Sequence, residues 1–307
     1  MSASGGRSAG SGDSKVLIAR VIADQAALSA HSEAVVHALE AQGARVLGAD
    51  PLPLDEGVLQ LMVEGGSAEG LRAVVDRHIA PSDLLIADHL PQIPKVFVSD
   101  MDSTMIGQEC IDELADFAGI KPEIAAITER AMQGELDFAE ALTERVRLLG
   151  GLSEAAIQQC LDERIVAMPG ARALVATLKA HGCHTVLVTG GFHQFADPVA
   201  ERLGFERVVG NRLAVGQGRL TGGLVGTIVD SSVKEAVLRE EAALRGGNTL
   251  ATGDGANDIP MLIAATYGVA YHAKPKARAA AHGAIDRGDL TSVLRLLGIA
   301  QGDWAEG

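Results

Sequence analysis

The sequence predicts an α/β protein with a doubly wound, parallel-sheet core and an inserted helical cap, preceded by a small α+β domain. In residues 168–300, strand-like apolar runs alternate with helix-length segments, as is typical of parallel sheets. Residues 108–167 interrupt this alternation with helical segments alone. Residues 15–88 have a separate pattern and are followed by a linker, 89–94, that contains two prolines. The core is therefore expected at 95–107 and 168–300.

Composition limits the possible functions. A length of 307 residues suggests about two domains. The 26 basic and 40 acidic residues give a net charge of −14, which argues against a nucleic-acid or anionic-membrane partner. The sequence has no apolar run of about 20 residues, so we expect no membrane span. Three widely spaced cysteines indicate reduced thiols in a cytoplasmic protein. We expect the Gly/Ser-rich residues 1–14 to be a disordered tail.

The amino-terminal segment is expected to fold as a ferredoxin-like α+β domain. Its predicted order is βαββαβ, which is typical of that topology. Gly43 is suited to ending the first helix. The expected elements are a strand at 15–23, a helix at 25–42, strands at 45–54 and 58–64, a helix at 68–79 and a strand at 83–87.

The cap and the core follow from hydrophobic spacing. In the cap we expect helices at 110–118, 124–133, 138–149 and 153–164. In the core we expect helices at 170–181, 193–203, 232–244, 257–265, 274–282 and 289–297. The expected core strands are 184–188, a strand-rich stretch at 205–228, 248–252, 268–271 and a short strand near Ile285.

Two aspartates end the first apolar run of the core. Asp100 and Asp102 lie at i and i+2, so an extended chain directs both side chains to the same side. The carboxyl ends of strands are where open α/β sheets bind ligands. Two carboxylates this close repel each other unless a cation binds or one is protonated. The pair therefore indicates either a metal site or a nucleophile and an acid with separate roles.

Further polar motifs follow later strands. Asp254, Asn257 and Asp258 come after the run at 249–251, with glycines that allow a tight turn. Thr189 and Gly190 end another strand-like run and offer a hydroxyl and an N–H group suited to phosphate oxygens. Lys234 stands alone between these motifs, and taken alone it would be read as a surface lysine.

These four elements, in this order, resemble the haloacid dehalogenase superfamily, and within it the phosphoserine phosphatases. The resemblance covers about residues 95–290. It implies that Asp100 is a nucleophile that forms an aspartyl-phosphate and that Asp102 is the proton donor and later the general base. It implies Mg²⁺ bound by the Asp100 and Asp254 side chains and the Asp102 backbone carbonyl. It also implies that Lys234 neutralises phosphate charge.

The resemblance extends to substrate recognition. Thr189 and Gly190 would bind the phosphate, and Asn257 would donate to it. Asp258 would hydrogen-bond a water or orient Lys234. Three residues would recognise or enclose the remainder of O-phospho-L-serine: Glu109 the ammonium, Arg145 the carboxylate, and Phe138 as a shield against water.

Alternatives remain open at this stage. The closest is a phosphatase of the same superfamily for another small phosphoester, such as phosphohomoserine or phosphothreonine. A signalling receiver is disfavoured because Asp102 follows the phosphoacceptor and a cap is expected. A non-catalytic amino-acid-binding protein is disfavoured by the intact acidic set. The first domain resembles the ACT-like domains of some phosphoserine phosphatases. The Asp-x-Pro-Gly-like loop expected of an amino-acid-binding ACT domain is absent, and 23–26 read Ala-Asp-Gln-Ala instead. A structural role or a homodimer contact is therefore favoured over a ligand sensor.

Overall fold

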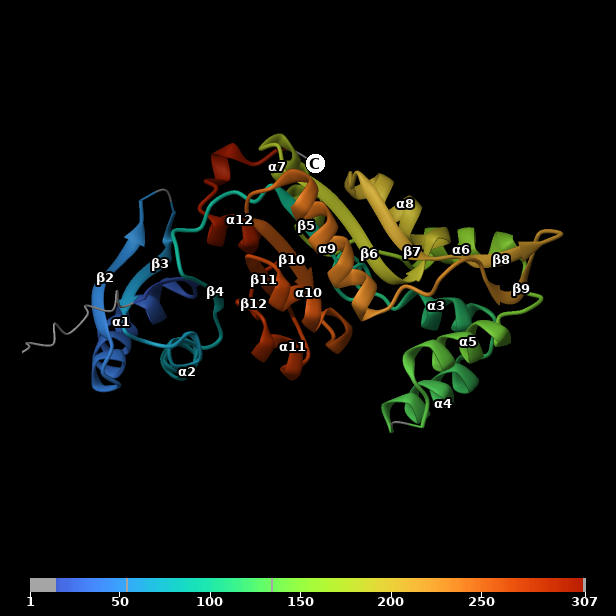
Figure 1. Ribbon diagram of the computed structural model, residues 1–307, viewed down its shortest axis with the longest axis horizontal. Helices are drawn as coiled ribbons and strands as arrows, with labels where there is room; N and C mark the ends of the chain where they lie inside the picture. Colours follow the sequence, from blue (N-terminus) through green and yellow to red (C-terminus); the bar gives the residue numbers. More distant parts are fainter. Residues whose placement is uncertain (1–14, 54, 134, 306–307) are drawn as a thin grey trace, which may run out of the picture.

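The computed structural model describes residues 15–53, 55–133 and 135–305. Figure 1 shows an elongated molecule with the amino-terminal domain at one end, the core in the middle and the cap helices at the other end. The expected tail at 1–14 lies outside the described residues. In the part of the chain that is described, no helix is long and apolar enough to cross a membrane.

The amino-terminal domain has the predicted ferredoxin-like order. Its four strands form an antiparallel sheet in the order β2-β3-β1-β4, and helices α1 and α2 pack on one face. Alternate strand residues such as Ala19 and Val21 face those helices and are fully buried, which is the period expected of a sheet with one face in a core. The elements are β1 (Val16–Ile22), α1 (Gln25–Ala41), β2 (Arg45–Leu52), β3 (Asp55–Glu64), α2 (Ala68–Ile79) and β4 (Asp83–Ala87).

The core is the predicted parallel sheet, with six strands in the order β12-β11-β10-β5-β6-β7. The strands are β5 (Val96–Ser99), β6 (His184–Phe192), β7 (Arg207–Asn211), β10 (Thr249–Gly253), β11 (Tyr267–Tyr271) and β12 (Gly283–Ile285). The helices are α7 (Ala171–Ala180), α8 (His193–Leu203), α9 (Ser231–Arg245), α10 (Ile259–Ala264), α11 (Pro275–Ala280) and α12 (Thr291–Leu297), with short 3₁₀ turns η1 (Ala256–Asp258) and η2 (Gln301–Asp303).

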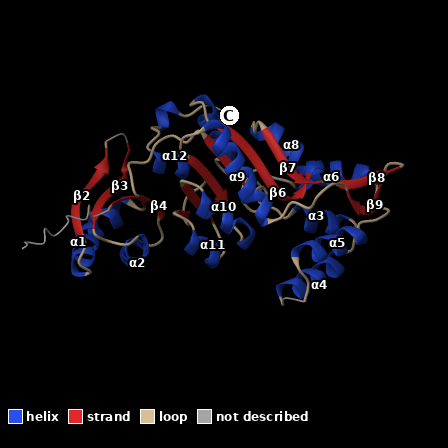
Figure 2. Cartoon of the chain, in the orientation of Figure 1, coloured by secondary structure: helices blue, strands red, loops and turns tan. Residues whose placement is uncertain are grey.

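Alternation along these strands produces the double winding. In β5, Val96 and Val98 face a cluster with α9, α10 and α11, whereas Phe97 faces the cluster that contains α7, α8 and α12. Each strand thus has apolar side chains on both faces, as buried parallel strands require. Figure 2 shows the resulting layers, with helices on both sides of the sheet.

The cap is the predicted helical insertion: α3 (Cys110–Phe117), α4 (Lys121–Met132), α5 (Phe138–Leu148) and α6 (Glu154–Arg164). The two chain segments that join it to the core pair with each other. Ile106 and Ala167 form an antiparallel bridge. The Gly107 N–H donates to the Val166 carbonyl at 3.0 Å, and the Met168 N–H donates to the Met105 carbonyl at 2.9 Å. The cap therefore leaves and rejoins the core through one two-stranded ribbon.

Two features of the fold differ from the prediction. The stretch at 205–228, expected to be core, contributes the hairpin β8 (Leu213–Gly216) and β9 (Arg219–Leu224), which is a separate two-stranded sheet. Its backbone pairs with the chain between α5 and α6, for example from the Gly151 N–H to the Leu220 carbonyl at 2.8 Å. The hairpin thus joins the cap, because its hydrogen-bonding edge is satisfied there rather than in the core sheet.

The second difference concerns the first domain, whose sheet continues the core sheet. Strand β4 pairs antiparallel with β12, with Leu85 opposite Gly283, so a single ten-stranded sheet crosses the boundary. A Cβ on Gly283 would lie 2.4 Å from the Leu84 carbonyl oxygen, so only glycine allows this approach. The two prolines at 89–94 predict a domain boundary, but the sequence does not reveal that the sheet edges on either side of this segment are joined.

Residues without a predicted role have structural ones. Trp304 packs against the main apolar cluster, and its Nε1–H donates to the Ile299 carbonyl at 3.1 Å. Cys110, Cys160 and Cys183 are free thiols and are buried, as expected of reduced thiols.

Candidate active site

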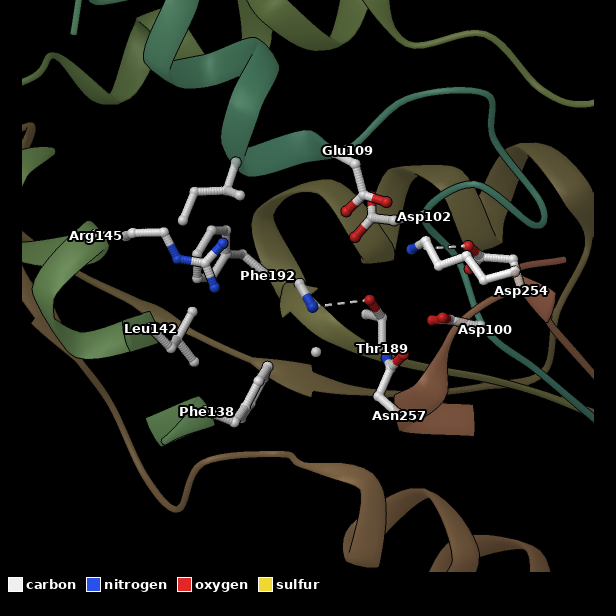
Figure 3. A pocket seen from close by; sticks show the side chains of 14 residues that line it. Asp100, Asp102, Glu109, Phe138, Leu142, Arg145, Thr189, Phe192, Asp254 and Asn257 are labelled. Carbon is white, nitrogen blue, oxygen red and sulfur yellow. Dashed lines mark hydrogen bonds and ion pairs between the residues drawn. The ribbon is translucent and has the colours of Figure 1, made fainter. Parts of the chain in front are cut away.

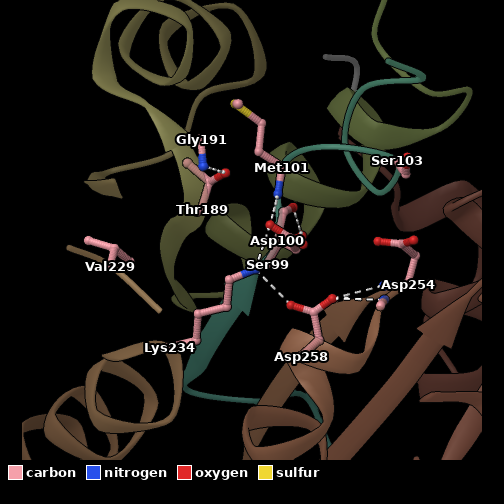
Figure 4. A network of polar contacts seen from close by, with 12 residues as sticks. Ser99, Asp100, Met101, Ser103, Thr189, Gly191, Val229, Lys234, Asp254 and Asp258 are labelled. Atoms are coloured by element: carbon pink, nitrogen blue, oxygen red, sulfur yellow. Dashed lines mark hydrogen bonds and ion pairs between the residues drawn. The ribbon is translucent and has the colours of Figure 1, made fainter. Parts of the chain in front are cut away.

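The carboxyl ends of three neighbouring strands bring the polar motifs together. Strand β5 lies between β6 and β10, so Asp100 comes next to Thr189 at the end of β6 and to Asp254 just after β10. Asp100 is 4% exposed and Asp254 8% exposed. Figure 4 shows these side chains converging, with Lys234 and Asp258 beside them.

Lys234 joins two carboxylates at the bottom of the site. Its Nζ lies 2.8 Å from Asp100 Oδ1 and 2.8 Å from Asp258 Oδ1, and the lysine is 1% exposed. Asp230 caps α9 by accepting from the Val233 N–H at 3.1 Å, which fixes the first turn from which Lys234 projects. Burial lowers the pKa of Lys234, but the attraction of Asp100 and Asp258 outweighs it and raises that pKa above its usual value. The lysine therefore stays charged.

Asp258 also holds the acidic loop in place. Its Oδ2 accepts from the Asp254 N–H at 3.1 Å and from the Gly255 N–H at 3.0 Å. A Cβ on Gly253 would lie 2.4 Å from Asp258 Cγ, which explains why a glycine precedes Asp254. Because Asp258 uses both oxygens on protein donors, it orients Lys234 and the loop rather than projecting into the cavity.

The carboxylates at the bottom of the site form a candidate cation site. Oxygen atoms of Asp100, Asp254 and Asp258 all lie within 4.8 Å of one another, and the three residues are buried. Burial, and then the repulsion of Asp258, raise the pKa of Asp100 well above its usual value despite Lys234. Burial likewise raises the pKa of Asp254. The two lysines that contact this cluster, Lys234 and Lys274, do not balance its three carboxylates. The carboxylates of Asp100 and Asp254 therefore fit a hard divalent cation.

Asp102 has an environment suited to proton transfer. Its Oδ1 accepts from the Cys110 N–H at 3.1 Å, at the first residue of α3. Burial and then the nearby charge of Glu109 raise the pKa of Asp102 to about 7. A carboxyl group that titrates near neutral pH can both donate and accept a proton under the same conditions.

The end of β6 provides donors next to Asp100. Thr189 Oγ1 accepts from the Gly191 N–H at 2.8 Å, so its own hydroxyl hydrogen is free to point elsewhere. Asn211 fixes the strand end by donating to the Gly190 carbonyl at 2.8 Å. A Cβ on Gly191 would lie 2.9 Å from Asp102 Oδ2, so the glycine lets the strand approach the acidic pair.

The cap supplies the opposite wall. Asp137 begins α5 with a capping box, in which it accepts from the Glu140 N–H at 2.8 Å and Glu140 accepts from the Asp137 N–H at 3.0 Å. Phe138 and Arg145 follow, seven residues apart and on one helix face. Figure 3 shows Arg145 and Phe138 on the side of the cavity opposite Asp100.

Glu109 completes the wall at the end of the first cap connection. It accepts from Ser103 Oγ at 2.8 Å, and Ser103 has a left-handed backbone with φ of 53°. The predicted site residues all line one cavity, except Lys234 and Asp258, which are buried beside Asp100 and Asp254. The cavity between core and cap measures about 140 Å³ and is lined by Asp100, Asp102, Glu109, Ile111, Phe138, Leu142, Arg145, Thr189, Gly190, Gly191, Phe192, Asp254, Asn257 and Lys274.

Sequence reasoning missed some of these residues. Lys274 stands out, because its Nζ lies 3.3 Å from Asp254 Oδ2 and its backbone N–H donates to the Asp254 carbonyl at 2.9 Å. A signal was available: Lys274 lies three residues after β11, which neighbours β10. Ile111 and Leu142 were missed because they look like ordinary helix-core residues.

Comparisons with known proteins agree with this geometry. Residues 97–262 match the family model of haloacid dehalogenase-like hydrolases, and 231–297 match a second model of the same description. A phosphoserine phosphatase of Albidiferax ferrireducens is 46% identical over 66% of this chain and 89% of its own length. One from Streptomyces coelicolor is 45% identical over 67% of this chain but only 51% of its own length.

One solved structure extends the likeness to 94% of the chain. A probable phosphoserine phosphatase of Vibrio cholerae has a TM-score of 0.72 and 32% identity over 94% of this chain and 88% of its own. A substrate-bound phosphoserine phosphatase has a TM-score of 0.61 and 36% identity over 66% of this chain and 97% of its own. The chain belongs to the haloacid dehalogenase-like hydrolase family, which confirms the resemblance noted in its sequence.

Proposed function

We propose that this hydrolase is a Mg²⁺-dependent phosphatase that converts O-phospho-L-serine to L-serine and phosphate, the last step of L-serine biosynthesis. One observation carries the proposal. A buried set of carboxylates with a lysine faces, across a cavity of about 140 Å³, a wall with one carboxylate and one guanidinium. Phosphoserine has the matching groups: a phosphoester at one end, and an ammonium and a carboxylate at the other.

Asp100 is the proposed nucleophile. The Met101 N–H, at 2.7 Å, and Lys234 Nζ, at 2.8 Å, both contact Oδ1. We therefore assign the attack on phosphorus to Oδ2. The new bond joins Oδ2 to phosphorus, the bond from phosphorus to the seryl oxygen breaks, and Asp102 gives its proton to that oxygen. The first half-reaction releases L-serine and leaves an aspartyl-phosphate.

Asp102 then acts in the opposite direction. Now deprotonated, it takes a proton from a water molecule whose oxygen attacks phosphorus. The bond from phosphorus to Asp100 breaks, phosphate leaves, and both carboxyl groups return to their starting states. Lys234, together with the Thr189 hydroxyl and the Gly190 N–H, would stabilise the negative charge on the phosphoryl oxygens in both steps.

The donor set fits Mg²⁺, with Asp100, Asp254 and the Asp102 backbone carbonyl as proposed ligands. When bound, such an ion would reduce the repulsion between the phosphate and these carboxylates. Asp258 would not be a ligand, since its oxygens bind Lys234 and two backbone N–H groups.

Recognition of the amino acid is assigned to the wall. Arg145 would bind the carboxylate of the substrate, and Glu109 its ammonium. Phe138 lines the cavity directly beside Gly190, since a Cβ on Gly190 would lie 3.2 Å from the Phe138 ring. Asn257 lines the cavity next to Asp254 and would donate to the phosphate. A homodimer contact through the amino-terminal domain, a domain boundary at 89–94 and a cytoplasmic location remain predictions.

Phosphate release from O-phospho-L-serine tests the function. We expect release with Mg²⁺, none with EDTA, and a loss of about 10⁴-fold or more for Asp100→Asn, which keeps the shape but removes the nucleophile. Phosphothreonine and phosphohomoserine should be poorer substrates. Comparable or faster turnover of either ester would contradict the substrate assignment. Activity that survives Asp100→Asn would move the nucleophile elsewhere.

A further inference from the structure

Helix α11 connects the catalytic pocket to the amino-terminal domain. Lys274 is the residue at its amino-terminal end, and that residue lines the pocket and contacts Asp254 through both side chain and backbone. Figure 1 shows α11 on the side of the core nearest to α2 of the amino-terminal domain. The two ends of this one short helix thus face two different regions of the molecule.

The Lys274–Asp254 pair is too exposed to position itself. The lysine side chain is 69% exposed, and ion pairs of this kind contribute about 0–1 kcal/mol. A lysine side chain also loses considerable conformational freedom when held in one place. The position of Lys274 therefore depends on its backbone, and so on how α11 is held: by Ala277, which is buried in a core cluster, and by α2 at the other end of the helix.

Helix α2 of the amino-terminal domain binds the carboxyl-terminal end of α11. Arg278 binds Asp76 of α2 through two hydrogen bonds, at 2.9 and 2.7 Å, and also binds Asp286 at 2.8 Å. Arg72, also from α2, donates to the backbone carbonyls of Arg278 at 3.0 Å and Ala281 at 2.5 Å. These are carbonyls at the end of α11, so a cation from the first domain satisfies acceptors that the helix itself leaves unpaired.

Side-chain pairs matter at this junction because the two helices are not closely packed. A cavity of about 550 Å³ lies between them, lined by residues of both, including Ala68 and Arg72 from the α2 side and Pro275 and Arg278 from the α11 side. Apolar packing between α2 and α11 is limited by this cavity. The polar contacts of Arg72 and Asp76 therefore contribute much of the interaction between the two helices.

We propose that the amino-terminal domain positions Lys274 in the catalytic pocket through α11, and that its ammonium group competes with the active-site cation for Asp254. This inference rests on the proposed metal site. The ammonium lies 3.3 Å from Oδ2 of Asp254, whose carboxylate is a proposed ligand of the cation. A cation that binds there must displace or repel a like charge that the first domain holds in place.

Calorimetric titration of Mg²⁺ into the metal-stripped, full-length protein tests this without substrate. Lys274→Met should lower the Kd for Mg²⁺ about three- to tenfold, because a competing charge is gone. Lys274→Arg should keep the Kd near that of the unaltered protein. Asp76→Asn should lower the Kd for Mg²⁺ by a smaller factor. The variant that combines Asp76→Asn with Lys274→Met should have the same Kd as Lys274→Met alone, since both changes act through α11.

The chain offers a matched control. Asp55 of β3 binds Arg295 of α12 through two hydrogen bonds, at 2.6 and 2.9 Å, which also joins the first domain to the core but bypasses α11. Asp55→Asn should leave the Kd unchanged. If Asp76→Asn unfolds the protein, Arg72→Met replaces it, and thermal unfolding checks both.

Two outcomes would overturn the proposal: an unchanged or higher Kd in Lys274→Met, or equal effects of Asp76→Asn and Asp55→Asn. Failure of the proposed function gives a different result, in which these Mg²⁺ affinities follow the pattern but phosphoserine is not hydrolysed.

Discussion

The two sides of the catalytic pocket differ in how firmly their residues are held. On the core side, Lys234 is 1% exposed and Asp258 0% exposed, and each has at least two polar partners within the described chain. On the cap side, Phe138 is 39% exposed, and Glu109 is exposed with one hydrogen bond to Ser103. The reacting groups are therefore fixed before substrate arrives, whereas the recognition groups are adjustable.

This difference corresponds to two different demands. Stabilising charge in a transition state needs groups that do not reorganise during the step. Recognising the rest of a substrate requires a wall that can open for binding and release. Core strands meet the first demand because their ends are locked by the sheet. A helical insertion joined to the core by a two-stranded ribbon would suit the second.

The largest effect is expected on the core side, from Lys234→Met. We expect activity to fall about 10²–10³-fold, because charge on the phosphoryl oxygens loses its partner. We also expect the metal-free protein to lose about 3–5 kcal/mol of folding stability, because two buried carboxylates lose their shared cation. Initial rates and chemical denaturation measure the two effects.

Lys179→Met is the matched control, since that exposed lysine lies outside the pocket and, among the described residues, donates to the Gly204 carbonyl. A Lys234→Met protein as stable as this control would show that the core side is not as tightly organised as its contacts indicate.

An intermediate effect is expected on the cap side, from Arg145→Ala. The side chain is half-buried and makes a hydrogen bond at 3.3 Å to the Ala141 carbonyl, so stability should change little. The KM for phosphoserine should rise about 10–100-fold with a smaller change in kcat, because ground-state binding of the carboxylate is lost.

Phosphoethanolamine, which lacks that carboxylate, separates recognition from general damage. The Arg145→Ala change should leave its hydrolysis nearly unaffected. An equal loss on both substrates would mean that Arg145 supports the fold of the wall rather than the substrate.

The smallest effect is a pH dependence that links the two sides. The pKa of Asp102 is raised to about 7 by burial and by Glu109, so between about pH 4 and pH 7 the folded protein binds a proton that the unfolded chain has lost. Stability of the metal-free protein should therefore fall as pH rises through this range. Glu109→Gln removes the negative charge that adds to the effect of burial, so it should lower the pKa of Asp102. The loss of stability with rising pH should then be smaller.

Urea denaturation in EDTA at pH 5.5 and 7.5 measures this difference. Glu135→Gln is a suitable control, because Glu135 binds Arg130 on the outer surface of the cap. An identical pH dependence in Glu109→Gln and in the control would remove Glu109 as a cause of the Asp102 shift.

The sequence was most informative where a functional residue follows directly after a strand-like run. Asp100, Asp102, Thr189 and Asp254 each follow a strand-like run, and parallel strands place their ends together, so their convergence could be predicted. Lys234 was assigned only from the resemblance, since a lone lysine on a helix carries no local signal. The ferredoxin-like order of the first domain was predicted from its pattern of apolar runs.

Contacts between distant segments could not be predicted. The pairing of β4 with β12 joins Leu85 to Gly283, nearly 200 residues later, and nothing in either run indicates its partner. The strands of the β8–β9 hairpin look like core strands in the sequence, whereas in the structure they pair with each other and β9 bonds to the chain between α5 and α6. Lys274 lies three residues after the strand-like run at 268–271, but only the structure shows that its loop returns to Asp254.

The ribbon formed by the bridge between Ile106 and Ala167 has a consequence for how such enzymes diversify. The two core segments that lead into and out of the cap are already paired with each other. The fold of the core therefore does not depend on the length of the insert between them. A different insert could be exchanged at these two positions, with the β8–β9 hairpin trimmed to match, and the same phosphoryl-transfer machinery would receive a new selectivity. A chimaera joined at residues 107 and 166 would inherit its chemistry from one parent and its choice of ester from the other.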